Sequence, residues 1–359
     1  MSREPGTSCT SRISKNVKST KSGKLLETGT TLAHFSHSKE NDERRPELAG
    51  RDFAVYSRML IPLDGSTTAE QVVPYARTFA RRLKLPVELL AVVDGEALLT
   101  SVERARVFDD LMDQEKRKSK EYLERIAQRF SGSRVKRTVE EGKAAEAIIE
   151  KAAADRSTLI AMTTHGRSGL NRWLLGSVAE KVLRATTNPL LLVRAAPDAR
   201  TEGEATLKSI VVPLDGSKLA ESVLPAVANV AEKLDVEIFL FRAYSNPYRA
   251  FISGGGYYAV NVDELLAGVR DEARNYLEEK MAELSQQGIE KTSYLLQEGV
   301  AADEIVAVAS HTPESLIAMC SHGRSGVKRW ALGSVTETVV RHSDKPVLVL
   351  RPASMPPGD

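Results

Sequence analysis

Short apolar runs alternate with amphipathic stretches along the chain after residue 58. Apolar residues recur at helical spacing after Ser66, over about 102–130, after Gly142 and over about 177–184. The apolar runs between these stretches are each short enough for one strand. They span Met59–Leu63, Val87–Val93, Val135–Val139, Thr158–Met162 and Leu190–Val193. The pattern therefore predicts strands and helices in alternation.

The same series occurs again in the C-terminal half. Ser209–Ser217 repeats the first strand and its Leu-Asp-Gly-Ser ending, so that Asp215 corresponds to Asp64. From Gly142 onward the two copies align without a gap. The matching segments of the second copy are Val236–Phe241, Glu298–Gly299, Ser315–Met319 and Val347–Leu350. The repeat is far longer than the roughly 50 residues of solenoid units, which indicates a duplicated domain.

Strands that alternate with helices form parallel sheets with helices on both faces. We therefore predict an α/β protein with two repeated, open, parallel five-stranded sheets. In such sheets a ligand binds outside the carboxyl ends of the strands, near the point where the strand order reverses. The first strand ends at Asp64 and the fourth at Met162, so we expect both ends to face one crevice.

A glycine-bearing loop follows the fourth strand in each copy. It lies within Met162–Val178 in the first copy and Met319–Val335 in the second, and it leads from a strand into a helix. Glycines let the backbone approach an anion closely, and the first N–H groups of a helix point at it. This order of strand, loop and helix indicates a phosphate-binding site.

The composition suggests how the chain is divided. Residues 1–53 are rich in Ser, Thr, Lys, Arg and Glu and lack apolar periodicity, which predicts a disordered extension. A basic, Ser-rich leader also resembles an organellar transit segment, but Glu4 and Glu27 argue against that interpretation. The remaining segments are expected to be a first domain at 54–195, a linker at 196–206, a second domain at 207–353 and a tail at 354–359.

Charge and cysteine content exclude several classes of function. The chain has 50 Lys and Arg against 48 Asp and Glu, so no strong field favours nucleic acid or a membrane surface as partner. No apolar run approaches the roughly 20 residues of a membrane-spanning helix. Cys9 and Cys320 are the two cysteines, too few for a disulfide framework. We expect a cytoplasmic protein.

The combined motifs resemble those of the universal stress protein family. They are Pro-Leu-Asp-Gly-Ser after the first strand, His-Gly-Arg-Ser-Gly in the loop, nine residues between Gly166 and Gly176, and Gly-Ser-Val before the last helix. The resemblance covers about 55–195 and 207–352. It implies a flavodoxin-like sheet of the adenine-nucleotide alpha-hydrolase-like superfamily. Many members bind ATP or a related adenine nucleotide, and others bind no nucleotide.

The ATP-binding pattern of that family is Gly, two residues, Gly, nine residues, Gly, then Ser or Thr. Its second and third glycines fall on Gly166 and Gly176 here, and on Gly323 and Gly333 in the second copy. The first glycine is replaced by a side chain in both copies, by Thr163 and by Cys320. The resemblance therefore predicts a nucleotide site whose strand end departs from the pattern.

The candidate nucleotide-binding residues lie at the carboxyl ends of the strands and in the loop. In the first copy they are Pro62, Asp64, Val93, Thr163, Gly166, Arg167, Gly176, Ser177 and Val178. In the second copy they are Pro213, Asp215, Cys320, Gly323, Arg324, Gly333, Ser334 and Val335. The resemblance places the aspartates against adenine and makes ATP, with Mg²⁺, the expected cofactor.

Several of these residues have a structural alternative. Asp64 and Asp215 also suit an Asx-type turn, and Ser177 and Ser334 suit a helix N-cap. Arg167 and Arg324 suit either phosphate pairing or solvated loop positions. The loop histidine, His165, titrates near neutral pH but lacks a nucleophile or second acid of dependable geometry, so we expect it to order its loop. No His, Cys and Asp spacing predicts a metal site.

The fifth apolar runs, Leu190–Val193 and Val347–Leu350, are candidate sheet edges. In the family resembled, this strand forms the dimer. Two copies in one chain therefore imply an internal pseudo-dimer, and a homodimer of whole chains is also expected.

The hypothesis that combines these observations is a tandem universal stress protein that binds ATP or a related adenine nucleotide. It would act in stress response or regulation with at most slow hydrolysis. The alternative is a scaffold or small-ligand-binding stress protein whose sites have lost nucleotide through Thr163 and Cys320. An adenylating or hydrolysing enzyme of the same superfamily ranks third, because no catalytic set is evident.

Overall fold

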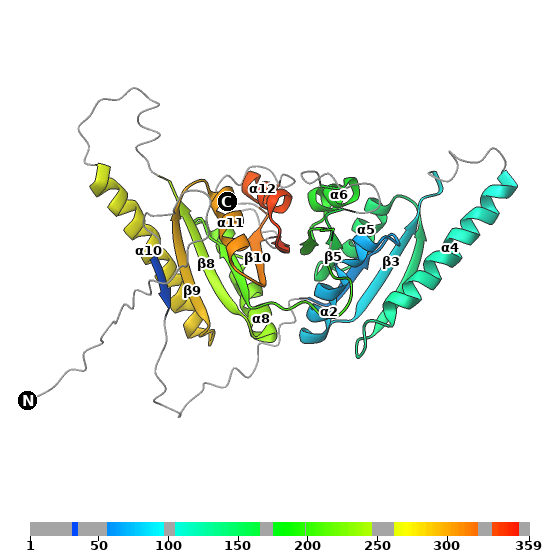
Figure 1. Cartoon of the computed structure of the whole chain (residues 1–359), viewed down its shortest axis with the longest axis horizontal. Helices are drawn as coiled ribbons and strands as arrows, with labels where there is room; N and C mark the ends of the chain where they lie inside the picture. Colours follow the sequence, from blue (N-terminus) through cyan, green and yellow to red (C-terminus); the bar gives the residue numbers. More distant parts are fainter. Residues whose placement is uncertain are drawn as a thin grey trace, which may run out of the picture.

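The computed structural model describes residues 31–34, 56–96, 105–165, 175–197, 199–245, 262–321 and 332–351. Its two halves lie side by side, with the first repeat on the right of the view and the second on the left (Figure 1). The expected tail and most of the expected disordered extension fall outside the described residues, and stay predictions.

One continuous sheet runs through both repeats. Its 11 strands follow the order β1-β9-β8-β7-β10-β11-β6-β5-β2-β3-β4. The strands of the first repeat are β2 (Arg58–Pro62), β3 (Val87–Val93), β4 (Val135–Glu141), β5 (Thr158–Thr163) and β6 (Leu190–Val193). Those of the second are β7 (Ser209–Pro213), β8 (Glu237–Tyr244), β9 (Thr292–Glu298), β10 (Ser315–Cys320) and β11 (Val347–Leu350). The five-stranded parallel units are as predicted, but they are joined into one sheet rather than left as two.

Within each repeat the strands are parallel and follow the order 3-2-1-4-5. This is the order of a doubly wound sheet whose direction of winding reverses between the first and fourth strands. Flavodoxin itself has the order 2-1-3-4-5 and belongs to the same doubly wound class. The predicted α/β architecture is confirmed, and its switch point lies between β2 and β5 and between β7 and β10.

Helices cover both faces of the sheet (Figure 1). On one face the buried side chains of α2, α4, α8 and α10 form a single core with alternate strand residues, and on the other those of α5, α6, α11 and α12 do the same. The helices of the first repeat are α1 (Thr67–Glu70), α2 (Val73–Arg82), α4 (Ala105–Ala127), α5 (Ala144–Ala153) and α6 (Ser177–Ala185). Those of the second are α7 (Lys218–Glu221), α8 (Leu224–Leu234), α10 (Val262–Gln286), α11 (Ala301–His311) and α12 (Ser334–His342).

The fifth strands join the two repeats. β6 and β11 pair antiparallel, with Leu191 opposite Leu348 at the centre of the pairing. Both leucines are fully buried. Because the pairs on either side, Leu190 with Val349 and Leu192 with Val347, exchange equivalent positions, a pseudo-twofold axis passes through this centre. The internal pseudo-dimer predicted from the apolar fifth strands is confirmed.

The two ends of the sheet differ. β4 carries the charged residues Lys136 and Arg137, which discourage pairing with another strand. β9 is apolar at its centre, and β1 (Thr31–His34) pairs with it antiparallel. For these four residues of the N-terminal extension the prediction of disorder is wrong, because the unpaired N–H and C=O groups of the β9 edge are available to a passing strand.

The segment between the repeats is fixed along α2. The side-chain amide of Gln71 exchanges two hydrogen bonds with the backbone of Ala196, at 2.8 and 2.9 Å. The Ala205 N–H donates to the Pro74 carbonyl at 3.1 Å, and the Thr78 hydroxyl donates to the Ala205 carbonyl at 2.8 Å. The linker predicted at 196–206 is therefore held against the first repeat at both of its ends.

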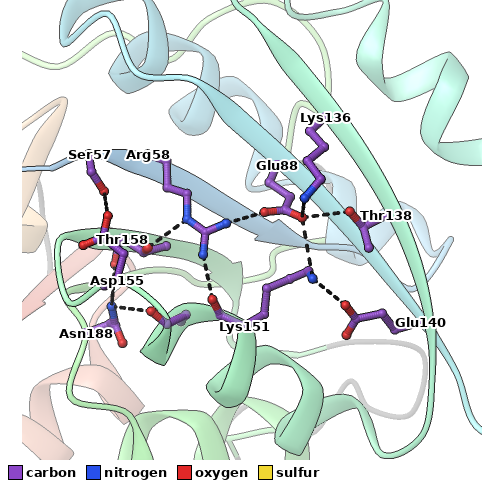
Figure 2. A network of polar contacts seen from close by, with 11 residues as sticks. Ser57, Arg58, Glu88, Lys136, Thr138, Glu140, Lys151, Asp155, Thr158 and Asn188 are labelled. Atoms are coloured by element: carbon purple, nitrogen blue, oxygen red, sulfur yellow. Dashed lines mark hydrogen bonds and ion pairs between the residues drawn. The ribbon is translucent and has the colours of Figure 1, made fainter.

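A buried carboxylate organises the amino-terminal ends of the strands in the first repeat (Figure 2). Glu88 on β3 is 3% exposed. It forms ion pairs with Arg58, with Lys136 at 3.1 Å and with Lys151 at 3.7 Å, and it accepts a hydrogen bond from the Thr138 hydroxyl at 2.8 Å. Burial alone would raise the pKa of Glu88, but these hydrogen bonds and charges outweigh it and lower the pKa below its ordinary value.

The second repeat has an apolar residue at the position of Glu88, and Glu237 on the same strand accepts a hydrogen bond from Ser293. Glu88 lies opposite Lys136 in the sheet register, and the equivalent pair is Phe239 and Ser293. Leu295 and Val308 stand at the positions of Thr138 and Lys151. Phe239, Leu295 and Val308 all belong to the apolar core of that face. One chain thus contains a paired-charge version and an apolar version of one structural element.

Candidate functional site

A cavity lies at the switch point of each repeat. The first measures about 220 Å³ and lies where β2 and β5 end; the second measures about 260 Å³ and lies where β7 and β10 end. Most predicted site residues line them. In the first cavity these are Pro62, Asp64, Thr163, Gly176, Ser177 and Val178, and in the second Pro213, Asp215, Cys320, Gly333, Ser334 and Val335. The structure therefore brings together, in each repeat, two chain segments about 100 residues apart.

The remaining predicted residues divide into two groups. Gly166, Arg167, Gly323 and Arg324 lie outside the described residues, and their role stays a prediction. Val93 does not line the first cavity, whereas its neighbour Val92 does. Successive side chains of a strand point to opposite faces, so only the β3 residues on the α5 side reach the cavity.

The apolar part of each cavity was not among the predicted site residues. In the first repeat Leu90, Ile148 and Met162 contribute to it. In the second, Phe241, Ile305 and Met319 do so. The period-two pattern of β3 and the apolar stripe of α5 carry the signal that could have identified them, because both point to the face on which the loop begins.

Asp64 and Asp215 form the same turn. The Ser66 N–H and hydroxyl both donate to Asp64 Oδ1, at 2.9 and 2.6 Å, and the Ser66 hydroxyl accepts from the Ala69 N–H at 3.1 Å. Asp215 repeats all three bonds through Ser217. The Asx-type turn is thus confirmed, Ser66 is the N-cap of α1, and each turn orients a carboxylate that lines its cavity.

The helix that begins at each cavity has no side-chain cap. Gly176 and Gly333 are the N-cap residues of α6 and α12, and neither helix has a side-chain hydrogen bond at its cap. The alternative in which Ser177 and Ser334 are the N-caps is therefore wrong; they are the first helical residues, and both are exposed. A helix start of this kind leaves backbone N–H groups for an anion or for water.

The two loops begin in different ways. The hydroxyl of Thr163 donates to the carbonyl of His165 at 2.7 Å, so the first loop is held by its own first residue. Cys320 offers no equivalent hydroxyl. Its carbonyl instead accepts a hydrogen bond from Thr336 of α12 at 2.9 Å, so the second loop is held from the following helix. Both Thr163 and Cys320 are buried.

His165 is among the residues that line the first cavity. Its Nδ1 lies 2.9 Å from the Thr164 hydroxyl, and its Nε2 is buried with no hydrogen-bond partner among the described residues. Burial, together with the positive charge of Arg194, lowers the pKa of His165, which keeps the imidazole neutral at pH 7. The Thr164 contact agrees with a histidine that orders its loop.

Over the part of the chain that the structure describes, no group of three or more His, Cys, Asp or Glu residues could hold a metal ion. The same residues contain no helix long and apolar enough to cross a membrane.

The strand order and the duplicated crevice define a tandem α/β protein of the doubly wound class. The sequence pattern of the universal stress protein family matches residues 56–194 and 206–351, which is most of the 359 residues. The chain therefore belongs to the universal stress protein family.

Curated proteins and a solved structure agree with this assignment. The chain is 33% identical over 150 residues to universal stress protein MJ0531 of Methanocaldococcus jannaschii, covering 42% of this chain and 85% of that protein. It is 38% identical over 89 residues to MJ0577 of the same organism, spanning 25% of this chain and about half, 54%, of that relative. A crystal structure of a universal stress protein from Archaeoglobus fulgidus has the same fold, with a TM-score of 0.60, 23% identity and coverage of 82% of this chain and 98% of that one.

Proposed function

We propose that this tandem universal stress protein binds ATP or a related adenine nucleotide in the cavity of each repeat. The observation that carries the proposal is the duplicated cavity at the switch point, where an aspartate and an uncapped helix start converge on an apolar pocket. Doubly wound sheets bind ligands at this position.

The chemistry of the cavity suits the parts of a nucleotide. The apolar residues Leu90, Ile148 and Met162 fit the flat faces of a base, and the Asp64 carboxylate accepts hydrogen bonds from a base or ribose. An anionic phosphate would be repelled by Asp64, and the N-terminus of α6 offers it N–H groups instead. Mg²⁺ is held largely by phosphates and water at such sites, so it needs no cluster of protein carboxylates.

Binding is proposed to serve stress response or regulation, with occupancy changing a surface that a partner contacts. Hydrolysis would be slow at most, because we find no nucleophile placed beside a general base among the described residues. A cytoplasmic location and a homodimer of whole chains belong to this proposal as well; two cysteines are too few for a disulfide framework, which agrees with a reducing compartment.

Titration calorimetry of the full chain with ATP and Mg²⁺ tests the proposal. We expect heat and a stoichiometry of two nucleotides per chain, one for each cavity. Val178→Trp and Val335→Trp place a bulky ring into the first and second cavity respectively, and each is expected to reduce the stoichiometry to one. If no heat of binding is measured at millimolar ATP, and circular dichroism shows that the protein is folded, the proposal is contradicted.

The alternative function is a scaffold or small-ligand protein that binds no nucleotide. One observation favours it: Thr163 and Cys320 line the cavities at the position that is glycine in the family's ATP-binding pattern. Under the nucleotide proposal, Thr163→Gly together with Cys320→Gly is expected to change ATP affinity by less than about threefold, which is under 1 kcal/mol.

A gain of about tenfold or more, equivalent to roughly 1.4 kcal/mol, supports the alternative instead. Thr163→Ser is the matched control, since it keeps a hydroxyl for the His165 carbonyl and removes only a methyl group. Calorimetry with ATP, ADP, AMP and cyclic AMP measures these affinities.

A further inference from the structure

An arginine of the first repeat holds the far end of a helix in the second. Arg194 follows the last residue of β6 directly, and its Nη1 donates to the carbonyls of Arg341, His342 and Ser343 at 3.4, 3.0 and 3.2 Å. These are the last carbonyls of α12. A guanidinium at a helix C-terminus donates hydrogen bonds to carbonyls that have no partner within the helix, and its positive charge interacts favourably with the helix dipole.

The second repeat returns the contact. Arg351 follows β11 directly, as Arg194 follows β6, and its Nη2 donates to the Leu183 carbonyl in the last turn of α6. α6 and α12 are the helices whose N-termini line the two cavities. Each helix therefore begins at the cavity of its own repeat and ends on an arginine of the other repeat.

Each arginine also adjoins the cavity of its own repeat. Val193, which precedes Arg194, accepts a hydrogen bond from the Thr164 N–H at 2.9 Å, at the start of the first loop. Leu350, which precedes Arg351, accepts one from the Ser321 N–H at 2.9 Å, at the start of the second loop. Arg194 lies close enough to His165 for its charge to act on that ring. A continuous set of contacts thus runs from one cavity to the other in both directions.

We propose that Arg194 and Arg351 are positioning residues that couple the two ligand sites, so that occupancy of one cavity tightens binding in the other. The inference rests on the proposed function. An anion at the N-terminus of α12 and a cation at its C-terminus both stabilise the docked helix. A ligand in the second cavity therefore strengthens the hold of α12 on Arg194, and through Val193 it fixes Thr164, which lines the first cavity. Because the first ligand has already ordered these contacts, the second ligand binds without that entropic cost, and the coupling is therefore positive.

Other ion pairs across the same interface link α6 and α12 directly, and not through the residues that precede the loops. Arg184 pairs with Glu337 at 2.8 Å, and its side chain is 47% exposed. Exposed pairs of this kind contribute little to stability, and Arg184 is not adjacent to either loop. Arg184→Met is therefore a matched control, because it removes an inter-repeat contact without touching the residues that precede the loops.

Stepwise binding constants for ATP and Mg²⁺, measured by calorimetry on the full chain, test the coupling. In the unmodified protein we expect the second binding step to be at least about fivefold tighter than the first, after the statistical factor is removed. In Arg194→Met with Arg351→Met, which keep most of the side-chain length and lose the donors, the second step is expected to be no tighter than the first. Arg184→Met should retain the difference.

Amide hydrogen exchange on the unliganded chain tests the same contacts without nucleotide. Arg194→Met is expected to speed exchange by at least about fivefold at two sites, at Thr164 in the first loop and at Ser343, whose N–H donates to the Val339 carbonyl at the end of α12, whereas Arg184→Met should affect neither. A second step that is no tighter than the first in the unmodified protein, or a tighter second step that persists in the double variant, overturns the proposal. If no variant binds ATP, the proposed function fails, and unchanged exchange at Thr164 and Ser343 then overturns the coupling independently.

Discussion

Replacing Glu88 with alanine is expected to lower the free energy of unfolding by about 3–5 kcal/mol, because it removes the ion-pair partner of Arg58 and leaves Lys151 paired with Glu140 alone. Arg58 and Lys151 are only 24% and 18% exposed in their side chains, so water cannot fully replace the lost carboxylate. Urea unfolding followed by circular dichroism measures the change. A loss below about 1 kcal/mol would contradict the view that this cluster is a coupled, desolvated unit.

The second repeat provides the control for this experiment. A variant with Arg58→Ser, Glu88→Phe, Thr138→Leu and Lys151→Val copies its apolar solution into the first repeat. Well-packed apolar residues often equal or exceed the stability of a buried ion pair. We expect this variant to recover most of the loss seen in Glu88→Ala, to within about 1.5 kcal/mol of the unmodified protein.

The Glu88 network also gives a defined pH dependence. The pKa of Glu88 in the folded protein is lower than its ordinary value of 4.5. The unfolded chain therefore takes up the proton first as the pH falls, so the stability due to this group is present above pH 4.5 and lost as the pH falls through the folded pKa. The apolar four-residue variant lacks this group, and its stability should fall less steeply over the same range.

Leu191→Asp is expected to cost about 4 kcal/mol or more, because it puts an unpaired carboxylate into a core position. Leu191 lies at the centre of the pairing between β6 and β11, opposite Leu348, and both side chains are fully inaccessible. The substitution acts on both repeats at once, since one continuous sheet crosses this point. Thermal unfolding followed by circular dichroism and calorimetry measures the effect.

The control for Leu191→Asp is the same change at an exposed leucine. Leu265 on α10 is 39% exposed, so Leu265→Asp should alter stability by no more than about 0.5 kcal/mol. We further expect the unmodified chain to unfold in one transition and the Leu191 variant in two, as the repeats separate. Two transitions in the unmodified protein would mean that the pairing of β6 with β11 contributes little to the cooperative unfolding of the two repeats.

The sequence predicted the elements most closely where a strand is apolar on both faces. Val87–Val93 and Leu190–Val193 are the bounds of β3 and β6 without change, and β5 differs from its predicted range by one residue. Such runs are unambiguous because helices cover both sides of the sheet. The strand order then predicted that Asp64 and the loop after the fourth strand face one crevice, and Asp64 and Ser177 line one cavity.

Features that depend on contacts between distant residues were not predicted. The Glu88 cluster joins β2, β3, β4 and α5, and no local pattern distinguishes a buried Glu from an exposed one. The choice between Val92 and Val93 depends on which face of β3 the cavity occupies. The N-cap at Gly176 instead of Ser177 depends on where the loop turns into α6, and helix boundaries are uncertain by a residue or two from sequence alone.

The pairing of β6 with β11 within one chain has an evolutionary consequence. In a dimer of identical chains every substitution occurs twice, so a residue that suits one subunit must also be tolerated in the other. Here the two partners are encoded separately, and each can change alone. The paired charges of one core, the apolar residues of the other, and the exchange of Thr163 for Cys320 are differences that an identical pair could not hold. Encoding both halves in one chain removes the constraint of symmetry, so that each cavity can specialise around a shared axis.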